Sequence, residues 1–254
     1  MSRLRFGGTS WVVPGSFADN LRVLAENVGD MELVLFDTPQ ASNIPSRAEV
    51  AELAALCREL RMTCTVHFAR DISIATDAAA RTQDEDAALR LLELFEPLDP
   101  FAWIVHFCGE RRGPSPSADM ERWLDHTQRS AARLAAAAGD SHKICAETLD
   151  YDFDLIYDLV KGAGLSVCLD VGHLVKYGFD ARAKVREYIA DARVLHIHGV
   201  RPDGTDHIDL SYFDPELFEF LRAAAGDGKE RVATMEVFEG DYAKSLAALK
   251  KLLK

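Results

Sequence analysis

Short apolar runs alternate with longer segments of mixed character along the whole chain. The apolar runs are rich in Val, Leu, Ile and Phe, which is typical of strands buried on both faces of a sheet. The mixed segments repeat apolar residues at helical spacing, as in Phe17, Leu21 and Leu24, and this predicts amphipathic helices. We therefore expect eight strands, at residues 3–9, 31–36, 64–68, 101–107, 143–148, 166–170, 193–198 and 231–238.

A helix is expected after each strand. The first begins near residue 16, and the others cover residues 47–60, 77–95, 117–138, 152–161, 181–190, 214–225 and 242–253. Eight such units in 254 residues average about 32 residues each, which matches one (β/α)8 barrel. An open doubly wound sheet is the alternative, but FGGTSW after the first strand lacks the G-x-G-x-x-G spacing. Because no linker interrupts residues 1–254, we expect a single domain.

Composition and charge narrow the class of partner. The net charge is −12, and the basic residues are scattered among acids apart from Arg111 and Arg112. A nucleic-acid footprint gathers Lys and Arg on one face, so we expect a small-molecule substrate and no nucleic acid. The absence of a long apolar run or a leader pattern predicts a soluble cytoplasmic protein with no membrane contact. The five cysteines show no CxxC pairing and are expected to be reduced core residues.

Metal-type side chains recur where the predicted strands end. All strands of a barrel point their carboxyl ends at one face, so residues far apart in sequence converge there. Six of the eight histidines lie at or just beyond a strand end, and only His126 and His142 lie elsewhere. The candidate ligands at strand ends are His67, His106, Glu147, Asp170, His198 and Glu236, and His173 and His207 lie in the loops that follow.

These acids and imidazoles together predict a metal site. A single histidine at a strand end is more often a hydrogen-bonded core residue than a ligand. Several carboxylates on one rim, however, repel one another unless cations lie between them, and no arginine occupies a neighbouring strand end. The mixed nitrogen and oxygen donors suit Zn2+, Mn2+ or Fe2+ better than Ca2+ or Mg2+.

Several nearby residues are expected to have supporting roles. His196 and His198 are two residues apart, so both side chains can enter the barrel at different depths. We expect His198, nearer the rim, to be the ligand, and His196 to support it or to belong to the core. Asp37 and Asp71 are expected to contact substrate or to hold a histidine tautomer.

The order of these residues resembles the xylose-isomerase-like barrel superfamily, specifically its type 2 apurinic-site endonuclease branch, over essentially the whole chain. The resemblance implies two or three divalent ions, with Zn2+ foremost and Mn2+, Fe2+ or Co2+ as alternatives. In that pattern Glu147 bridges two ions. The remaining ligands are His67 and His106 for one ion, and Asp170, His198 and Glu236 for the other.

The same resemblance implies a third ion, held by His173, His207 and an acid two residues before the last histidine. That position is Thr205 here, so Asp203 or Asp206 has to substitute. The sugar isomerases and epimerases of the superfamily need only one ion, held by two Glu, one Asp and one His. Here these are Glu147, Glu236, Asp170 and His198. Because they do not require His67 and His106, these two histidines favour the multinuclear phosphoesterases.

The segment TSWVVPG, residues 9–15, gives a narrower resemblance to the cobamide-remodelling phosphodiesterases of this superfamily. Those enzymes open the nucleotide loop of a corrinoid and separate α-ribazole from cobinamide phosphate. A corrinoid requires an apolar platform, for which Trp11 and Trp103 are the candidates. Trp103 is also suited to the core.

The leading hypothesis is therefore a metal-dependent hydrolase, a phosphodiesterase acting on a cobamide. A bound divalent ion lowers the pKa of its water to about 7, so no protein nucleophile is needed. We expect Glu147, Glu236 and His173 to act in catalysis. The alternatives are a sugar isomerase or epimerase of the same fold, and a metal-bearing binding protein without turnover.

Overall fold

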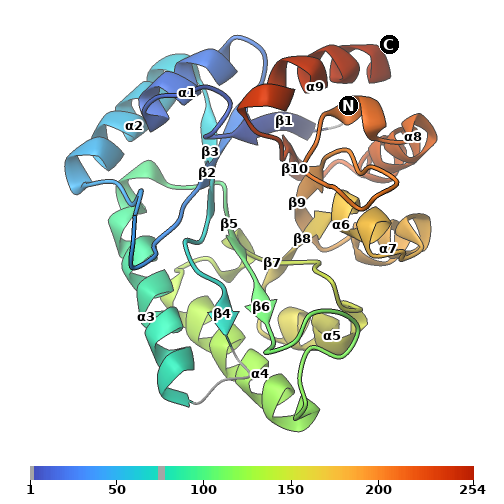
Figure 1. The fold of residues 1–254 in the computed structure, drawn as a ribbon. Coiled ribbons are helices and arrows are strands. Elements are labelled where there is room, and N and C mark those ends of the chain that lie inside the picture. Colours follow the sequence, from blue (N-terminus) through green and yellow to red (C-terminus); the bar gives the residue numbers. More distant parts are fainter. Residues whose placement is uncertain (1–2, 74–77) are drawn as a thin grey trace.

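A closed barrel of eight parallel strands forms the centre of the molecule (Figure 1). The computed structural model describes residues 3–73 and 78–254. Around the barrel the strands follow the order β1, β10, β9, β8, β7, β5, β3 and β2. Their bounds are β1 (Arg3–Thr9), β2 (Asp30–Val34), β3 (Thr63–His67), β5 (Ala102–Val105), β7 (Ile144–Glu147), β8 (Ser166–Asp170), β9 (Ala192–Ile197) and β10 (Glu230–Met235). The predicted (β/α)8 barrel is confirmed.

Helices follow the strands and surround the barrel (Figure 1). In the described ranges they are α1 (Phe17–Ala25), α2 (Arg47–Leu60), α3 (Ala78–Leu94), α4 (Met120–Ala137), α5 (Asp154–Gly162), α6 (Val171–Lys176), α7 (Ala181–Tyr188), α8 (Pro215–Ala224) and α9 (Glu239–Leu252). Ser16 and Ser46 begin α1 and α2 with capping boxes, because an acid three residues later bonds back to each. None of the described helices is long and apolar enough to pass through a lipid bilayer.

Several short elements differ from the prediction. The expected strand 101–107 divides at His106, and its last part becomes β6 (Phe107–Cys108), which pairs with β4 (Ile72–Ser73). His173, expected in a loop, lies in α6. Short 3-10 helices are η1 (Glu96–Leu98), η2 (Ser141–Lys143) and η3 (Leu210–Tyr212). The first residue of the predicted third helix, Asp77, lies outside the described residues. Elements this short carry no periodicity that a sequence pattern can detect.

The barrel interior has an apolar tier and a polar tier. A separate apolar cluster consists of Phe101, Ala102, Ile104, Cys145, Cys168, Val194 and Val232. Nearer the carboxyl ends, the interior is polar and contains buried Glu32, Thr65, Glu147, His196 and Thr234. The five cysteines are free and four of them are buried, as expected for reduced core residues. The polar tier therefore connects the core to the face where the strands end.

One buried acid makes stability depend on pH. Burial raises the pKa of Asp30, at the start of β2, from 3.8 to about 7, although the Thr63 hydroxyl donates to it at 2.5 Å. Because the unfolded chain releases this proton at lower pH, we expect the free energy of unfolding to fall as pH rises from about 4 to about 7.

Replacing Asp30 by Asn should abolish this slope and stabilise the protein at pH 8 by up to about 4 kcal/mol. Denaturant unfolding across this pH range measures the effect. Asp125→Asn is the control, since Asp125 lies half-exposed on α4. An unchanged slope in Asp30→Asn would contradict the buried proton.

Candidate metal centre

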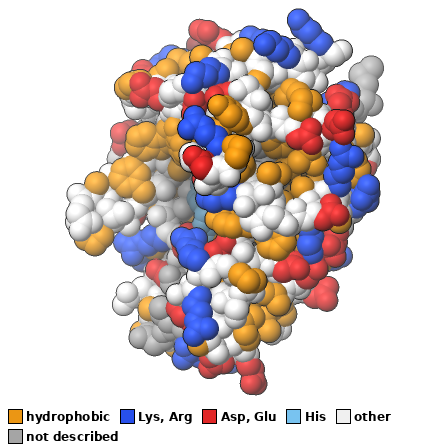
Figure 2. All heavy atoms as spheres, turned by 45° about the vertical axis from the view of Figure 1, so that its right-hand side comes forward, with side chains coloured by type: hydrophobic (Ala, Val, Ile, Leu, Met, Phe, Trp, Pro, Cys, Tyr) orange, Lys and Arg blue, Asp and Glu red, His pale blue; other side chains and the backbone are white. Residues whose placement is uncertain are grey.

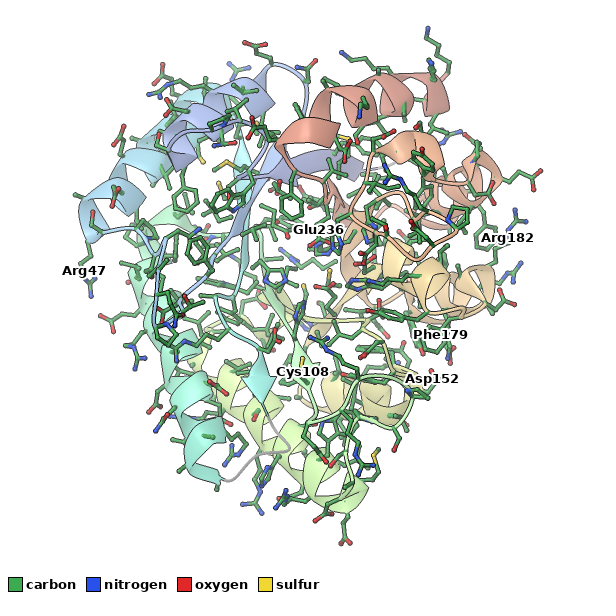
Figure 3. The ribbon with its side chains drawn as sticks, in the orientation of Figure 1. Arg47, Cys108, Asp152, Phe179, Arg182 and Glu236 are labelled. Atoms are coloured by element: carbon green, nitrogen blue, oxygen red, sulfur yellow. The ribbon has the colours of Figure 1, made fainter. Side chains whose placement is uncertain are left out.

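A cavity of about 610 Å3 opens at the carboxyl ends of the barrel strands. Figure 2 shows histidine at the floor of a hollow, with Lys or Arg side chains at its border. In Figure 3, Glu236 lies near the middle of the ring of strands. The side chains that line the cavity are Asp71, His106, Arg112, Glu147, Leu149, Asp150, His173, Lys176, Tyr177, Asp206, His207 and Glu236.

The first candidate metal position lies at the ends of β3, β5 and β7. Nε2 of His67 is 3.1 Å from Nε2 of His106, and Oε2 of Glu147 is 3.0 Å from the latter. The opposite nitrogens are occupied, because Nδ1 of His67 donates to the Phe68 carbonyl at 3.1 Å and Nδ1 of His106 donates to Asp71 at 2.8 Å. Two nitrogen lone pairs and a carboxylate therefore converge, which favours a bound cation. Asp71 holds a histidine tautomer, one of the two roles expected for it.

The second candidate position shares Glu147 with the first. Ligand atoms of Glu147, Asp170, His196 and Glu236 lie within 4.8 Å of one another. Nε2 of His196 donates to Glu32 at 2.9 Å, so Nδ1 faces Glu236 Oε2 at 3.1 Å and Glu147 Oε1 at 3.6 Å. Among the described atoms, His196 Nδ1 and Glu236 Oε2 are buried without a hydrogen-bond partner. These donors fit a divalent ion placed between them.

A third group contains Asp170, His173, His198 and His207, again with ligand atoms within 4.8 Å of one another. Nδ1 of His173 donates to Asp170 at 2.9 Å and to the Thr148 carbonyl at 3.1 Å, which leaves Nε2 for the cavity. Nε2 of His207 lies 3.4 Å from Glu236 Oε2. Two of the three imidazoles in this group therefore have a nitrogen available.

His198 supports its neighbours instead of offering a lone pair. The backbone N–H of His207 donates to His198 Nδ1 at 3.1 Å, nearer than the Gly199 carbonyl at 3.3 Å. Because a backbone N–H can only donate, the His198 proton lies on Nε2, which faces Asp170 Oδ1 at 3.2 Å. Gly172 permits this approach, since a Cβ there would lie 2.2 Å from the His198 ring. The geometry favours His196, in β9, over His198, directly after it, as a metal ligand, and the sequence-based assignment of His198 stays a prediction.

Neither Asp203 nor Asp206, the two acids expected to substitute for the family aspartate at position 205, completes the third group. Asp203 accepts a hydrogen bond from the Thr205 N–H at 2.9 Å. Asp206 Oδ2 is bound to Lys176 Nζ at 2.7 Å and lies 3.2 Å from His207 Nδ1. Asp206 therefore holds the tautomer of His207, and neither acid takes the place of the family carboxylate. Two candidate positions are complete in carboxylate and imidazole donors, and the third is not.

Buried charge explains why these groups need cations. Burial raises the pKa of Glu147 and of Glu236, but the adjacent imidazoles outweigh it and hold both well below their usual range. Burial lowers the pKa of His106 and of His173, but Glu147 and Asp170 outweigh it and raise these values to about 10 and about 12. The carboxylates are thus ionised beside positive charge, which protons or divalent ions supply. Since a metal displaces imidazole protons, metal affinity should rise with pH.

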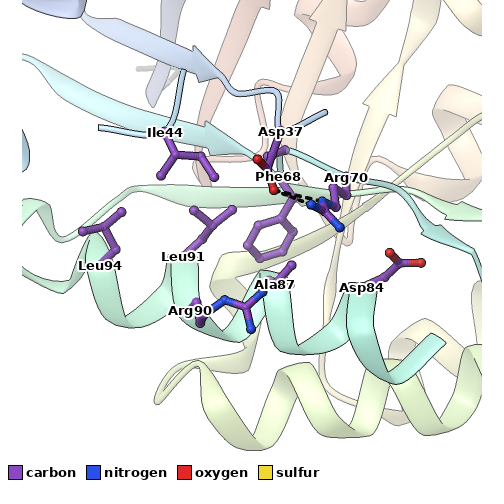
Figure 4. Close-up of a pocket in the computed structure, with 11 residues that line it drawn as sticks. Asp37, Ile44, Phe68, Arg70, Asp84, Ala87, Arg90, Leu91 and Leu94 are labelled. Atoms are coloured by element: carbon purple, nitrogen blue, oxygen red, sulfur yellow. Dashed lines mark hydrogen bonds and ion pairs between the residues drawn. The ribbon is translucent and has the colours of Figure 1, made fainter. Parts of the chain in front are cut away.

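Three other predicted residues lie elsewhere. Asp37 pairs with Arg70 at 2.5 Å in a separate pocket of about 200 Å3 beside α3 (Figure 4). Trp103 is buried between Phe68 and Phe95, so the expectation that it contacts a ligand is corrected. Trp11 follows β1 and is 41% exposed, which is compatible with its expected contact.

Three residues at the site were not predicted from the sequence. Glu32 lies within β2, and an acid inside an apolar run was the available signal. Lys176 lies one helical turn after His173 on α6, which was not predicted. Arg112 lies in the loop after β6, and in the sequence it stands out only as the neighbour of Arg111, a basic pair too small to bind a nucleic acid.

Comparison with known proteins gives a consistent picture. A family model described as xylose isomerase-like TIM barrel matches residues 24–252. A D-tagatose 3-epimerase-like protein superposes with a TM-score of 0.74 at 19% identity, covering 98% of this chain and 97% of that chain. The 3-keto-D-glucoside 4-epimerase of E. coli gives 0.72 at 14% identity, covering 98% and 99%. Endonuclease IV from Thermus thermophilus gives 0.69 at 17% identity, covering 98% and 97%. No curated protein sequence matches the chain.

Proposed function

Because this chain belongs to the xylose isomerase-like TIM barrel family, we propose that it is an enzyme that hydrolyses a phosphodiester with two divalent metal ions, Zn2+ foremost. One observation carries the proposal: the two oxygens of Glu147 face different ligand groups. Oε2 lies 3.0 Å from His106 Nε2, and Oε1 lies 3.6 Å from His196 Nδ1. A carboxylate shared in this way is suited to paired ions, which are used in phosphoryl transfer.

Each of the two complete ligand groups would hold one ion. His67, His106 and Glu147 would hold one ion. The other would be held by Glu147, Asp170, His196 and Glu236. When bound, paired ions make water nucleophilic at neutral pH and stabilise both the attacking and the leaving oxygen of a phosphodiester.

The surrounding residues orient this centre and move a proton. Asp71 fixes the tautomer of His106, and Glu32 fixes that of His196, so the free nitrogen of each ring stays directed at the centre. His173 has Nδ1 fixed by the Thr148 carbonyl and Asp170. Its Nε2 is the nitrogen left to donate a proton to the leaving oxygen.

The proposed substrate is a cobamide, cleaved in its nucleotide loop to α-ribazole and cobinamide phosphate. Tyr177 lines the cavity and is 39% exposed, and the rings of Phe238 and Trp11 are 42% and 41% exposed, so we propose that these aromatic rings offer the apolar platform. Phe238 lies 6.2 Å from the ring of His207. Asn20 holds the TSWVVPG segment that carries Trp11. Its side-chain oxygen accepts hydrogen bonds from the N–H groups of Val12 and Val13 at 2.9 and 3.0 Å.

A second candidate function is a divalent-metal sugar isomerase or epimerase. The group of Glu147, Asp170, His196 and Glu236 supports it, because two Glu, one Asp and one His suffice for a single ion. Epimerases are also among the structures that share this fold. A single-ion isomerase would leave His67 and His106 without a bound metal, although their Nε2 atoms lie 3.1 Å apart.

Incubation with a complete cobamide is expected to release α-ribazole without free phosphate, because water attacks the diester once. Chromatography with mass detection of both products measures this, and Glu147→Gln, which loses the shared carboxylate, is the inactive control. Epimerisation of a ketose under the same conditions, with the cobamide left intact, would replace this proposal by the second candidate.

A further inference from the structure

Two basic side chains enter a cavity that is otherwise rich in acids and histidines. Lys176 comes from α6 and Arg112 from the loop after β6, and both line the same space as Glu147 and Glu236. Figure 2 shows Lys or Arg side chains bordering a hollow that has histidine at its floor. Neither residue belongs to the candidate ligand groups.

Lys176 is positioned by its neighbours but remains reachable. Its Nζ donates to Asp206 at 2.7 Å and lies 5.3 Å from the ring of Tyr177. The side chain is 26% exposed. A partly exposed ion pair contributes about 0–1 kcal/mol to stability, so stability gives little reason to place a lysine here. Asp206 and Tyr177 engage two of its three ammonium protons, so one remains for another acceptor.

Backbone hydrogen bonds hold the loop that carries Arg112, so its guanidinium is not needed to hold the loop in place. The N–H of Gly113 donates to Asp150 at 2.7 Å, and the N–H of Arg111 donates to the Pro116 carbonyl at 3.0 Å. Gly109 packs so closely against Pro116 that a Cβ would lie 1.9 Å from its carbonyl oxygen. The loop is thus anchored, while no ion pair to the exposed Arg112 side chain is found in the described part of the chain.

We propose that Lys176 and Arg112 form an anion-binding pair that holds the non-bridging phosphoryl oxygens of the substrate over the metal centre. This inference rests on the proposed phosphodiester hydrolysis and assigns its substrate-binding cations. A phosphodiester carries one negative charge, which a lysine ammonium meets as a point charge and an arginine meets with paired N–H donors. A neutral sugar would leave Arg112 without an ionic partner and Lys176 with Asp206 alone.

The test measures binding of inorganic phosphate to the metal-loaded protein by titration calorimetry. Lys176→Met and Arg112→Met are each expected to weaken phosphate binding about tenfold, because each removes one charge-assisted contact. Lys176→Arg should restore most of the affinity. The matched control is Lys161→Met, since Lys161 also pairs with an aspartate, Asp191 at 3.1 Å, but lies on α5 outside the cavity. Metal content should remain that of the wild type.

The outcomes separate this inference from the proposed function. If the wild type cleaves a phosphodiester but both Met variants bind phosphate as Lys161→Met does, the anion pair is overturned and hydrolysis stands. If no phosphodiester is cleaved while phosphate binding still depends on Lys176 and Arg112, the anion pair stands and hydrolysis fails. A fall in melting temperature alone for Lys176→Met would reduce Lys176 to a structural partner of Asp206.

Discussion

Alanine at His67 or at His106 is expected to empty the first metal position and to lower phosphodiester cleavage at least about a thousandfold. Each imidazole supplies one of the two nitrogens that meet Glu147, so the loss of either leaves that ion with too few ligands. The double variant should be hardly worse than either single one, because residues that act through one ion are strongly non-additive.

Metal content by elemental analysis and turnover, measured on the single and double variants, test this expectation. His142→Ala is the matched control, since His142 lies in η2 before β7, at the opposite end of the barrel. Full metal occupancy with modest, additive losses would assign both histidines to substrate binding and would support the single-ion isomerase. Melting temperatures identify any variant that has simply lost its fold.

His196, in β9, and His198, directly after β9, are expected to respond very differently to substitution. His196→Asn should remove the second ion and lower activity about a thousandfold. The Nδ1 of His196 has no hydrogen-bond partner and offers its lone pair to a metal ion beside Glu236. His198→Asn should keep both ions and lose about tenfold, since it only supports Asp170 and the loop at His207. Glu32→Gln should lie between them, at about ten- to a hundredfold, because Glu32 orients His196.

Metal stoichiometry distinguishes His196→Asn from His198→Asn more directly than activity does. Loss of an ion from His198→Asn, with full occupancy in His196→Asn, would restore the assignment made from the sequence. The pH at which metal is half-released adds a second measure. We expect Glu32→Gln to raise this pH, because a weaker ligand competes less well with protons.

The alternating pattern predicted the barrel well, because strands buried on both faces are distinct in composition. The run at residues 166–170 coincides with β8, and the barrel topology then brings distant strand ends together without further information. His67, His106, Glu147 and Glu236 converge for this reason. Strand-end residues were therefore predictable as a group.

The depth of a side chain within the barrel was not predictable. His196 and His198 point to the same side of β9, and their heights depend on the register with β8. That register shifts between Val167 and Cys168 and places His196 opposite Asp170. A shift of this kind leaves no mark on hydrophobic periodicity. Lys176 was missed for a similar reason, since α6 has six residues and begins only because Asp170 caps it.

Asp170 also connects the second candidate metal position to the lining of the cavity. One of its oxygens accepts the His173 N–H at 2.8 Å and so begins α6, while the same carboxylate belongs to the second candidate metal position. The helix that carries His173 and Lys176 thus begins at a residue that also belongs to the second candidate metal position. A shift of that carboxylate would be transmitted to the first turn of α6, so the second candidate metal position and the helix that lines the cavity would move together.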